Sequence, residues 1–486
     1  MQKLSILSAC FAIFLCLVSN RLIAEVSDDI ELPDISDSTG TFISPREEKE
    51  LGNAFFRNIH RQLTINQDLE VQSYIQSIGH KLAAHADPQQ SPFHFFVVID
   101  KNLNAFAGPG GYIGINSGLI LATESESELA SVISHEIAHV TQRHLYRAFE
   151  AASQLSLPTA AATLAAILIG SQSPELGQAA LLAVQANSMQ QRINFTRSNE
   201  QEADRVGMQT LVKADFDPNG MPTFFERLQQ NSRYYGQAVP EFLRTHPVTA
   251  SRISDTRNRA EKQPYRHYPD SFAYRIIRTK LQVLGSKNLD ATRRYFLTLT
   301  EQGTAEQRAI ANYGLGWVAL KQQHFKEAQK IFSKLQKTLP EKPTLHIALA
   351  ETATESRHYP EALAILKKAR QRFPNYTPLS TLYLSTLIKT GQAQQARQEI
   401  LPLIHSDRQN PKIYHLLAQA YGKLQQPIES YRYLAEYYYL TGRTEKAIEH
   451  IKTAKNFTGI NFYQHAILDQ RLAFFIEEER ILKLGR

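Results

Sequence analysis

The chain has 486 residues, of which 43% are hydrophobic and 21% charged, so it is too long for one typical core and predicts two or three soluble globular domains. The formal net charge is +7 at pH 7, but Lys and Arg are spread among acidic residues. This distribution lacks the basic stripe of a nucleic-acid-binding protein, and we expect no nucleic acid among the partners.

The N-terminus has the layout of a secretory signal peptide, predicted at residues 1–24. Lys3 precedes an apolar run over residues 4–18, and Leu22-Ile23-Ala24 leads into an acidic segment. We predict cleavage near Ala24. Leu22 is larger than the small residue usually found three positions before the cut, so the exact bond is left open. An uncleaved anchor is the alternative.

Both cysteines of the chain, Cys10 and Cys16, lie inside this signal peptide. The mature protein would therefore contain neither a disulfide nor a thiolate metal ligand. Any metal ion would have to be held by His, Asp or Glu side chains.

After the signal, residues 25–43 are acidic and turn-rich and predict a flexible leader. Ser44 and Pro45 are typical of the N-cap and the first position of a helix, which we expect to end near Leu63. Apolar residues at helical spacing predict a second helix over 69–85.

Three short strands and a long helix come next. β-Branched and aromatic residues predict strands at 93–99, 104–107 and 112–115, with a tight turn at the glycine-rich residues 108–111. A helix is predicted over 124–149. These elements form a small α+β unit in which this helix packs against the sheet.

Residues 155–187 are rich in Ala and Leu, nearly uncharged, and divided near Gly170. Each half is too short to span a bilayer. We interpret the segment as a buried helical hairpin. The alternative is a mobile flap over the neighbouring cleft, or a surface that touches the membrane or an unfolded substrate, so peripheral membrane contact is left open.

The C-terminal part carries a repeat with a period of 34 residues. Small and apolar residues recur at this spacing, each set followed by a proline: Leu315, Gly316, Ala328, Phe332 and Pro340 match Leu349, Ala350, Ala362, Leu366 and Pro374. The order resembles that of the tetratricopeptide repeat. Residues 266–486 are therefore predicted to form an all-α tetratricopeptide-repeat solenoid with a concave binding face.

The candidate chemistry lies in the long helix, at His135-Glu136-Ile137-Ala138-His139. Residues i and i+4 share a helix face, so both imidazoles can reach one metal ion. Glu136 projects beside them, where its carboxylate can accept a proton from a metal-activated water. A tetrahedral catalytic zinc needs a third protein ligand and leaves one position for water.

The third ligand does not come from the same helix. The extended motif HExxHxxGxxH is excluded, because Gln142 and Leu145 occupy the positions of its glycine and its third histidine. His144 is off register, and we expect it to pack or to bind backbone.

An acidic helix downstream supplies a better candidate. Glu200 and Asp204 are four residues apart and share a face, whereas Glu202 points roughly the opposite way. We predict Glu200 on the metal and Asp204 as the hydrogen-bond acceptor for an imidazole N–H. An acidic, solvated helix start is the alternative for this segment taken alone.

Together these residues resemble a known family. His135-Glu136-x-x-His139 with Glu200-x-x-Ala203-Asp204 is similar to the gluzincin pattern of the CAAX-processing and heat-shock metalloproteases, as are residues 104–111 and 245–253. With its signal peptide and repeat tail, the chain resembles the periplasmic β-barrel assembly-enhancing proteases from Ser44 onward. Unlike the membrane-embedded relatives, it has no segment of about 20 apolar residues after the signal.

The resemblance implies an α+β zincin-type metalloprotease domain at residues 44–265, with one Zn²⁺ per chain, followed by the solenoid. It also implies a periplasmic endopeptidase with a chaperone-like role. Its substrates would be unfolded or misassembled outer-membrane proteins. Its repeat domain would contact the outer-membrane barrel assembly machinery.

Individual site residues carry further expectations. Glu136 would act as general base. Substrate would bind as an added strand on Tyr112, Ile113, Gly114 and Ile115. His246 has three open interpretations: an oxyanion stabiliser, a fourth zinc ligand that keeps the enzyme latent, or a packing residue. Arg252 would orient the same loop or pair with an acid.

Two other functions remain open. The chain could be a non-proteolytic holdase or assembly scaffold with a latent or vestigial metal site, or a hydrolase that processes peptidoglycan or lipoproteins. The intact Glu136 favours a protease over a scaffold, because a purely structural zinc does not need a base. The strand-like cleft and the helical repeats favour polypeptide over glycan substrates.

Overall fold

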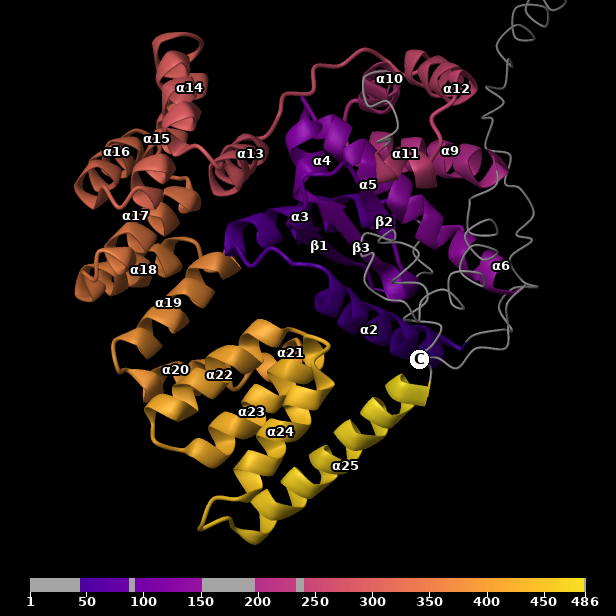
Figure 1. Cartoon of the computed structure of the whole chain (residues 1–486). Coiled ribbons are helices and arrows are strands. Elements are labelled where there is room, and N and C mark those ends of the chain that lie inside the picture. The colour runs from indigo at the N-terminus through magenta and orange to yellow at the C-terminus, as the bar shows by residue number, and fades with distance from the viewer. Residues whose placement is uncertain (1–43, 87–91, 151–196, 233–239, 485–486) are drawn as a thin grey trace, which may run out of the picture. The chain divides into compact units, whose positions relative to one another are not determined.

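The computed structural model describes residues 44–86, 92–150, 197–232 and 240–484 (Figure 1). The predicted signal peptide, the leader and the apolar segment at 155–187 lie outside these ranges and stay predictions, as does the domain boundary at residue 265. Among the described residues, no helix combines the length and the apolar character that a membrane span requires.

The N-terminal half of the described chain mixes helices with three strands. Its elements are α2 (Pro45–Gln62), α3 (Leu69–Ala83), β1 (His94–Val98), β2 (Ala105–Ala107), the 3-10 turn η2 (Pro109–Gly111), β3 (Tyr112–Asn116), α4 (Ser117–Ala122), α5 (Glu126–Thr141), α6 (His144–Glu150), α9 (Arg197–Lys213), α10 (Gly220–Ser232), α11 (Glu241–Thr245) and α12 (Ala250–Glu261). The predicted strands and the first two predicted helices are confirmed.

The predicted helix over 124–149 is wrong in one respect. It is broken into α5 and α6, because Arg143 adopts the left-handed conformation with φ of 53°. A residue in this conformation commonly ends a helix and redirects the chain. The first residue of α6, His144, therefore does not continue the spiral of α5.

The three strands form one sheet in the order β1-β3-β2. β1 runs parallel to β3, and β2 pairs antiparallel with the other edge of β3. Gly110 and Gly111 make the tight turn between β2 and β3, with φ of 69° and 74° that other residues rarely adopt.

Helices cover both faces of this sheet, which lies between α2 and α5 in Figure 1. On one face, Phe56 of α2 packs on Phe96 and Tyr112. On the other face, Phe95 and Ile113 join a core with apolar residues of α3 and α5. Successive residues of a strand point to opposite faces, so Phe95 and Phe96 enter different layers.

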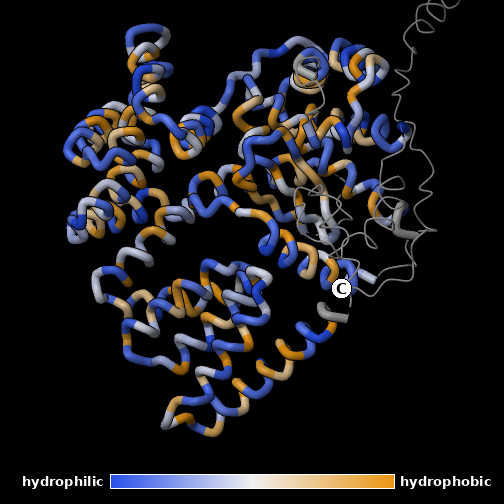
Figure 2. The backbone as a smooth tube through the Cα atoms, in the orientation of Figure 1, coloured by the Kyte–Doolittle hydropathy of each residue, from blue (hydrophilic) through white to orange (hydrophobic). Residues whose placement is uncertain are grey.

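From residue 272 to 484 the described chain is all helical. Its elements are α13 (Phe272–Gly285), α14 (Leu289–Glu301), α15 (Ala305–Lys321), α16 (Phe325–Thr338), α17 (Pro343–Glu355), α18 (Tyr359–Arg372), α19 (Thr377–Lys389), α20 (Ala393–Ile400), α21 (Leu403–Ser406), α22 (Pro411–Lys423), α23 (Pro427–Leu440), α24 (Thr444–Lys455) and α25 (Phe462–Leu484). Figure 2 shows hydrophobic and hydrophilic stretches alternating along these helices, as expected of helices that bury one face.

One backbone feature recurs along this helical array. A residue with φ between 56° and 83° stands at one helix-to-helix turn of each repeat, at Gln323, Arg357, Gly391, Gln425 and Gly459. These positions follow the 34-residue period of the sequence. The backbone therefore repeats with the sequence, and the predicted α+β domain followed by a helical repeat solenoid is confirmed as the fold class.

A buried ionic cluster joins α3 to the helical array. Lys280 of α13 is 0% exposed, with Nζ 2.7 Å from Asp68 Oδ2 and 2.8 Å from Glu70 Oε2. Tyr376 of α19 donates its hydroxyl to Glu70 Oε1 at 3.2 Å. We call these four residues the Lys280 cluster.

Candidate metal centre

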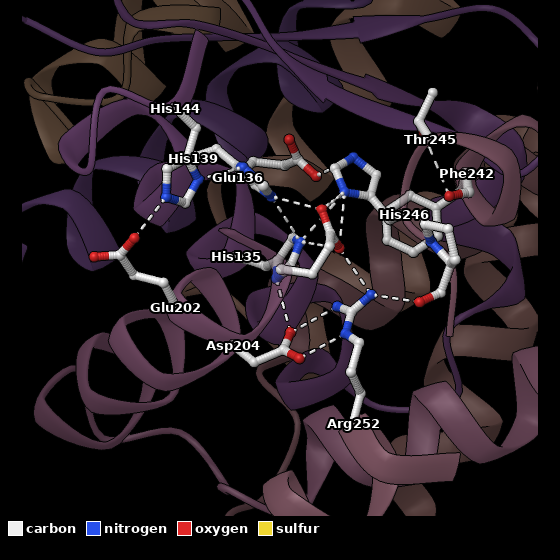
Figure 3. Close-up of polar contacts among 12 residues, drawn as sticks. His135, Glu136, His139, His144, Glu202, Asp204, Phe242, Thr245, His246 and Arg252 are labelled. Atoms are coloured by element: carbon white, nitrogen blue, oxygen red, sulfur yellow. Dashed lines mark hydrogen bonds and ion pairs between the residues drawn. The ribbon is translucent and has the colours of Figure 1, made fainter. Parts of the chain in front are cut away.

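Four side chains that can bind a metal ion converge at one point, and Figure 3 labels the three histidines among them. They are His135 and His139 from α5, Glu200 from α9 and His246 after α11, and one ligand atom of each lies within 4.8 Å of the others. Their exposed fractions are only 1 to 2%. The structure thus brings the three predicted ligands together and adds His246 to them.

Helix α5 presents both histidines on one face. The Ser125 hydroxyl caps its first turn by accepting a hydrogen bond from the Glu128 N–H. His135 and His139 lie one turn apart, and their Nε2 atoms are 3.0 Å from each other.

Helix α9 reaches the histidines because small residues let the two helices approach closely. A Cβ atom added at Gly207 would lie 3.1 Å from the His135 backbone, and Ala203 is fully buried. From this helix, Glu200 places Oε2 3.6 Å from His135 Nε2 and Oε1 3.5 Å from His139 Nε2.

The distances between these ligand atoms fit a tetrahedral zinc ion. Zinc bonds of about 2.0–2.1 Å at tetrahedral angles separate neighbouring ligand atoms by roughly 3.3 Å. Five of the six corresponding distances here are 3.0 to 3.6 Å, and all of the ligand atoms lie within 4.8 Å of one another. Imidazoles with one carboxylate also suit zinc better than calcium or magnesium, which prefer a shell of oxygen ligands.

His246 stands where a fourth ligand would bind. Its Nδ1 atom is 3.0 Å from Glu200 Oε1 and 3.4 Å from His135 Nε2, and its Nε2 atom is 3.6 Å from Glu136 Oε1. Its ring packs on Phe242, with centroids 5.0 Å apart. Of the three interpretations of His246, this geometry favours a zinc ligand, because a ring nitrogen points into the ligand group.

Glu136 lies beside the ligands. It is 1% exposed, its carboxylate is hydrogen-bonded to the backbone of Ala107, and Oε1 has no hydrogen-bond partner among the described residues. Burial raises the pKa of Glu136, and the nearby His246 and His135 offset this only in part. A carboxylate with a raised pKa and an available oxygen is suited to accept a proton.

Arg252 organises the acidic side of the centre. Its Nε and Nη2 atoms donate to the Asp204 carboxylate, both at 2.7 Å, and Asp204 Oδ1 lies 3.0 Å from His135 Nδ1. Arg252 Nη1 lies 2.7 Å from Glu200 Oε2 and donates to the Pro247 carbonyl at 2.9 Å. Burial raises the pKa of Asp204, but hydrogen bonds from Arg252 and His135 outweigh it and hold the pKa below its usual value. Arg252 thus both pairs with acids and fixes the loop after α11.

His144 and Glu202 are neighbours of this centre that the sequence did not reveal. His144 Nδ1 lies 2.8 Å from His139 Nδ1, and His144 Nε2 lies 3.0 Å from Glu202 Oε2. His144 packs as expected, with 0% exposure and its ring centroid 4.9 Å from that of His139, but the sequence did not show that its ring nitrogens contact two side chains. No spacing rule could show the contact, because it depends on the break at Arg143.

The predicted substrate strand is also wrong. Tyr112, Ile113, Gly114 and Ile115 belong to β3, the middle strand, which pairs with β1 on one side and β2 on the other. An added strand needs a free edge, which β3 lacks.

Strand β2 is the better candidate for an edge that binds substrate. Within the described residues it has no strand on its outer side. The Asn104 carbonyl and the Gly108 N–H bond to β3, so by antiparallel alternation the backbone groups of Ala105 and Ala107 face outward.

Comparison with known proteins agrees with this centre. The chain is 36% identical over 97% of its length to a Vibrio cholerae protein named as a β-barrel assembly-enhancing protease, 98% of which it covers. It is 34% identical over 91% of its length to the β-barrel assembly-enhancing protease of Escherichia coli strain K12, 90% of which it covers. The chain belongs to the β-barrel assembly-enhancing protease family.

The chain also matches the model of peptidase family M48 over residues 70–260 and a tetratricopeptide-repeat model over residues 353–420. Glu136 and the four converging side chains all lie in the M48 region. A mitochondrial metalloendopeptidase, OMA1 of Schizosaccharomyces pombe, is 31% identical over 37% of the chain and 50% of its own length. The protein is therefore a metalloprotease.

Proposed function

We propose that this protein is a periplasmic zinc endopeptidase, with one zinc ion per chain, that degrades misassembled outer-membrane β-barrel proteins and assists their assembly as a chaperone. The observation that carries the proposal is the convergence of His135, His139 and Glu200 with Glu136 beside them. The names of the relatives support a role in β-barrel assembly. The helical repeats support a contact with clients or with the barrel assembly machinery, because solenoids present extended binding surfaces.

Each side chain of the centre has a separate role in the proposed peptide hydrolysis. A bound zinc ion would polarise the scissile carbonyl and lower the pKa of a water molecule. His135, His139 and Glu200 hold the ion, and Asp204 accepts the Nδ1 proton of His135 so that Nε2 is free to bind. Glu136 accepts the proton of the attacking water and passes it to the leaving amine.

The outer edge of β2 is the proposed substrate site. The backbone groups of Ala105 and the carbonyl of Ala107 can pair with an extended peptide, an interaction that depends little on side chains. Because Ala107 also bonds to Glu136, a peptide on this edge lies next to the base. Recognition through backbone suits unfolded clients of varied sequence.

Cleavage of a loosely folded protein such as casein tests the zinc endopeptidase. We expect slow cleavage by the mature chain, loss of activity when a chelator removes the metal, and recovery when one equivalent of zinc is returned. Elemental analysis should find one zinc per chain. Cleavage that survives complete metal removal would contradict the proposal.

The second candidate, a non-proteolytic holdase or assembly scaffold with a latent metal site, is favoured by one observation. His246 lies where the fourth zinc ligand would bind, which is the position that a catalytic water requires. A metal centre in this arrangement would be inactive. The scaffold predicts suppression of client aggregation by the metal-free chain and no cleavage by any variant.

The variant His246→Ala distinguishes between the possible roles of His246. If His246 is the fourth ligand, its removal frees a position for water, and we expect basal cleavage of casein to rise at least about tenfold. His246→Cys, which still offers a zinc ligand, should stay as slow as the unaltered protein. Lower activity in His246→Ala would instead favour the oxyanion role.

A further inference from the structure

The hydrogen-bonded series His139–His144–Glu202 has no part in the chemistry proposed so far. We propose that His144, held by Glu202, is a positioning residue that fixes the orientation and the tautomer of the zinc ligand His139. The inference deepens the proposed function and rests on His139 being a metal ligand.

Metal binding by His139 determines which ring nitrogen carries the proton, first in His139 and then in His144. His139 directs Nε2 into the ligand group, 3.5 Å from Glu200 Oε1, and a ring nitrogen that binds a metal carries no proton. The proton of His139 is therefore on Nδ1, which donates to His144 Nδ1 at 2.8 Å. His144 must then carry its own proton on Nε2, which donates to Glu202 Oε2 at 3.0 Å.

The two zinc histidines are supported in different ways. His135 places Nδ1 directly against the carboxylate of Asp204, 3.0 Å from Oδ1, and Asp204 is 1% exposed. His139 reaches its carboxylate only through a second imidazole, and the side chain of Glu202 at the end of the series is 27% exposed. Arg147 of α6 holds Glu202 with Nη1 3.3 Å from Oε2. One ligand is thus anchored inside the protein, and the other is anchored through a series that ends at the surface.

The backbone is shaped to make this contact. On an unbroken helix, a residue five positions after His139 would be rotated by roughly 140° from it. The left-handed Arg143 turns the chain so that His144 returns to His139. This conformation costs about 1–2 kcal/mol for a residue other than glycine. His144 is 0% exposed with a partner at each ring nitrogen, as a buried imidazole requires.

Zinc affinity is the direct test, measured by competition with a chromophoric chelator on the full mature chain. His144→Leu keeps much of the side-chain volume but offers no acceptor, and we expect it to weaken zinc binding by about 10- to 100-fold. His144→Asn can keep an acceptor oxygen near the Nδ1 position and should recover most of that loss. Glu202→Ala should weaken binding less than His144→Leu, because His144 still accepts from His139.

Two control variants make the outcomes distinct. His346→Ala removes a buried histidine of the repeat array and should leave zinc affinity unchanged. His139→Ala should weaken binding most; if it does not, the assignment of the metal site fails. If His139→Ala weakens binding but His144→Leu and Glu202→Ala stay within twofold of the unaltered protein, the positioning role of His144 is wrong. Equal losses in His144→Leu and His144→Asn would also overturn it, because they would trace the effect to packing.

Discussion

Glu136→Gln should abolish proteolysis while the metal ion stays bound. Glutamine has the shape of glutamate but cannot accept the proton of the attacking water, and general-base catalysis contributes about 10²- to 10⁴-fold to such rates. Glu136 lies beside the ligand group, with Oε1 3.6 Å from His246 Nε2, so its replacement leaves the three proposed ligands in place. Turnover of casein and zinc content per chain should be measured on the same preparation.

A matched control is Glu124→Gln. The side chain of Glu124 is 74% exposed and pairs with Arg227 at 2.8 Å, so this variant should keep normal activity and normal zinc content. Activity retained in Glu136→Gln would refute the role of general base. Loss of zinc from that variant would show instead that Glu136 helps to bind the metal.

Lys280→Met should be the most destabilising single change outside the metal centre among the variants proposed here. Lys280 is 0% exposed and pairs with Asp68 and Glu70, and Glu70 itself is only 1% exposed. Removing the ammonium leaves two carboxylates without their cation, and breaking such a buried pair costs about 3–5 kcal/mol. Urea unfolding can be followed by the fluorescence of Trp317, the only tryptophan, whose ring centroid is 4.2 Å from Lys280 Nζ.

Two further variants test the reason for this loss. Glu70→Gln combined with Lys280→Met should recover part of the stability, because one uncompensated charge is removed with its partner. Arg46→Ala, which breaks a pair whose side chains are 88% and 52% exposed, should change the free energy of unfolding by less than about 1 kcal/mol. A loss below about 1 kcal/mol in Lys280→Met would mean that the Lys280 cluster contributes little to the stability of the fold.

Local patterns predicted the elements of this protein well. Capping residues located α2, helical spacing located α3, and β-branched and aromatic residues around a glycine-rich turn located β2 and β3. The i,i+4 spacings of His135 with His139 and of Glu200 with Asp204 predicted residues that the structure brings together, because this geometry is set within each helix.

The sequence could not predict contacts that depend on how separate elements are arranged in space. The order β1-β3-β2 is decided by a crossover, so the residue types at 112–115 could not show that this strand lies in the middle. The place of His246 depends on a loop that Arg252 fixes from another helix. The contact of His144 with His139 depends on a single left-handed residue, Arg143.

The left-handed residues at Gln323, Arg357, Gly391, Gln425 and Gly459 give the helical array a modular construction. Because each module turns the chain at the same point, duplication or loss of 34 residues between two such turns would keep the phase of every helix on either side. The length of the helical array can therefore change in evolution by whole repeats of 34 residues. Such steps beyond α19 would leave intact the Lys280 cluster, which joins α3 to α13 and α19. The same catalytic domain can thus be combined with helical arrays of different length, which suit partners of different size, while the residues of the metal centre stay unchanged.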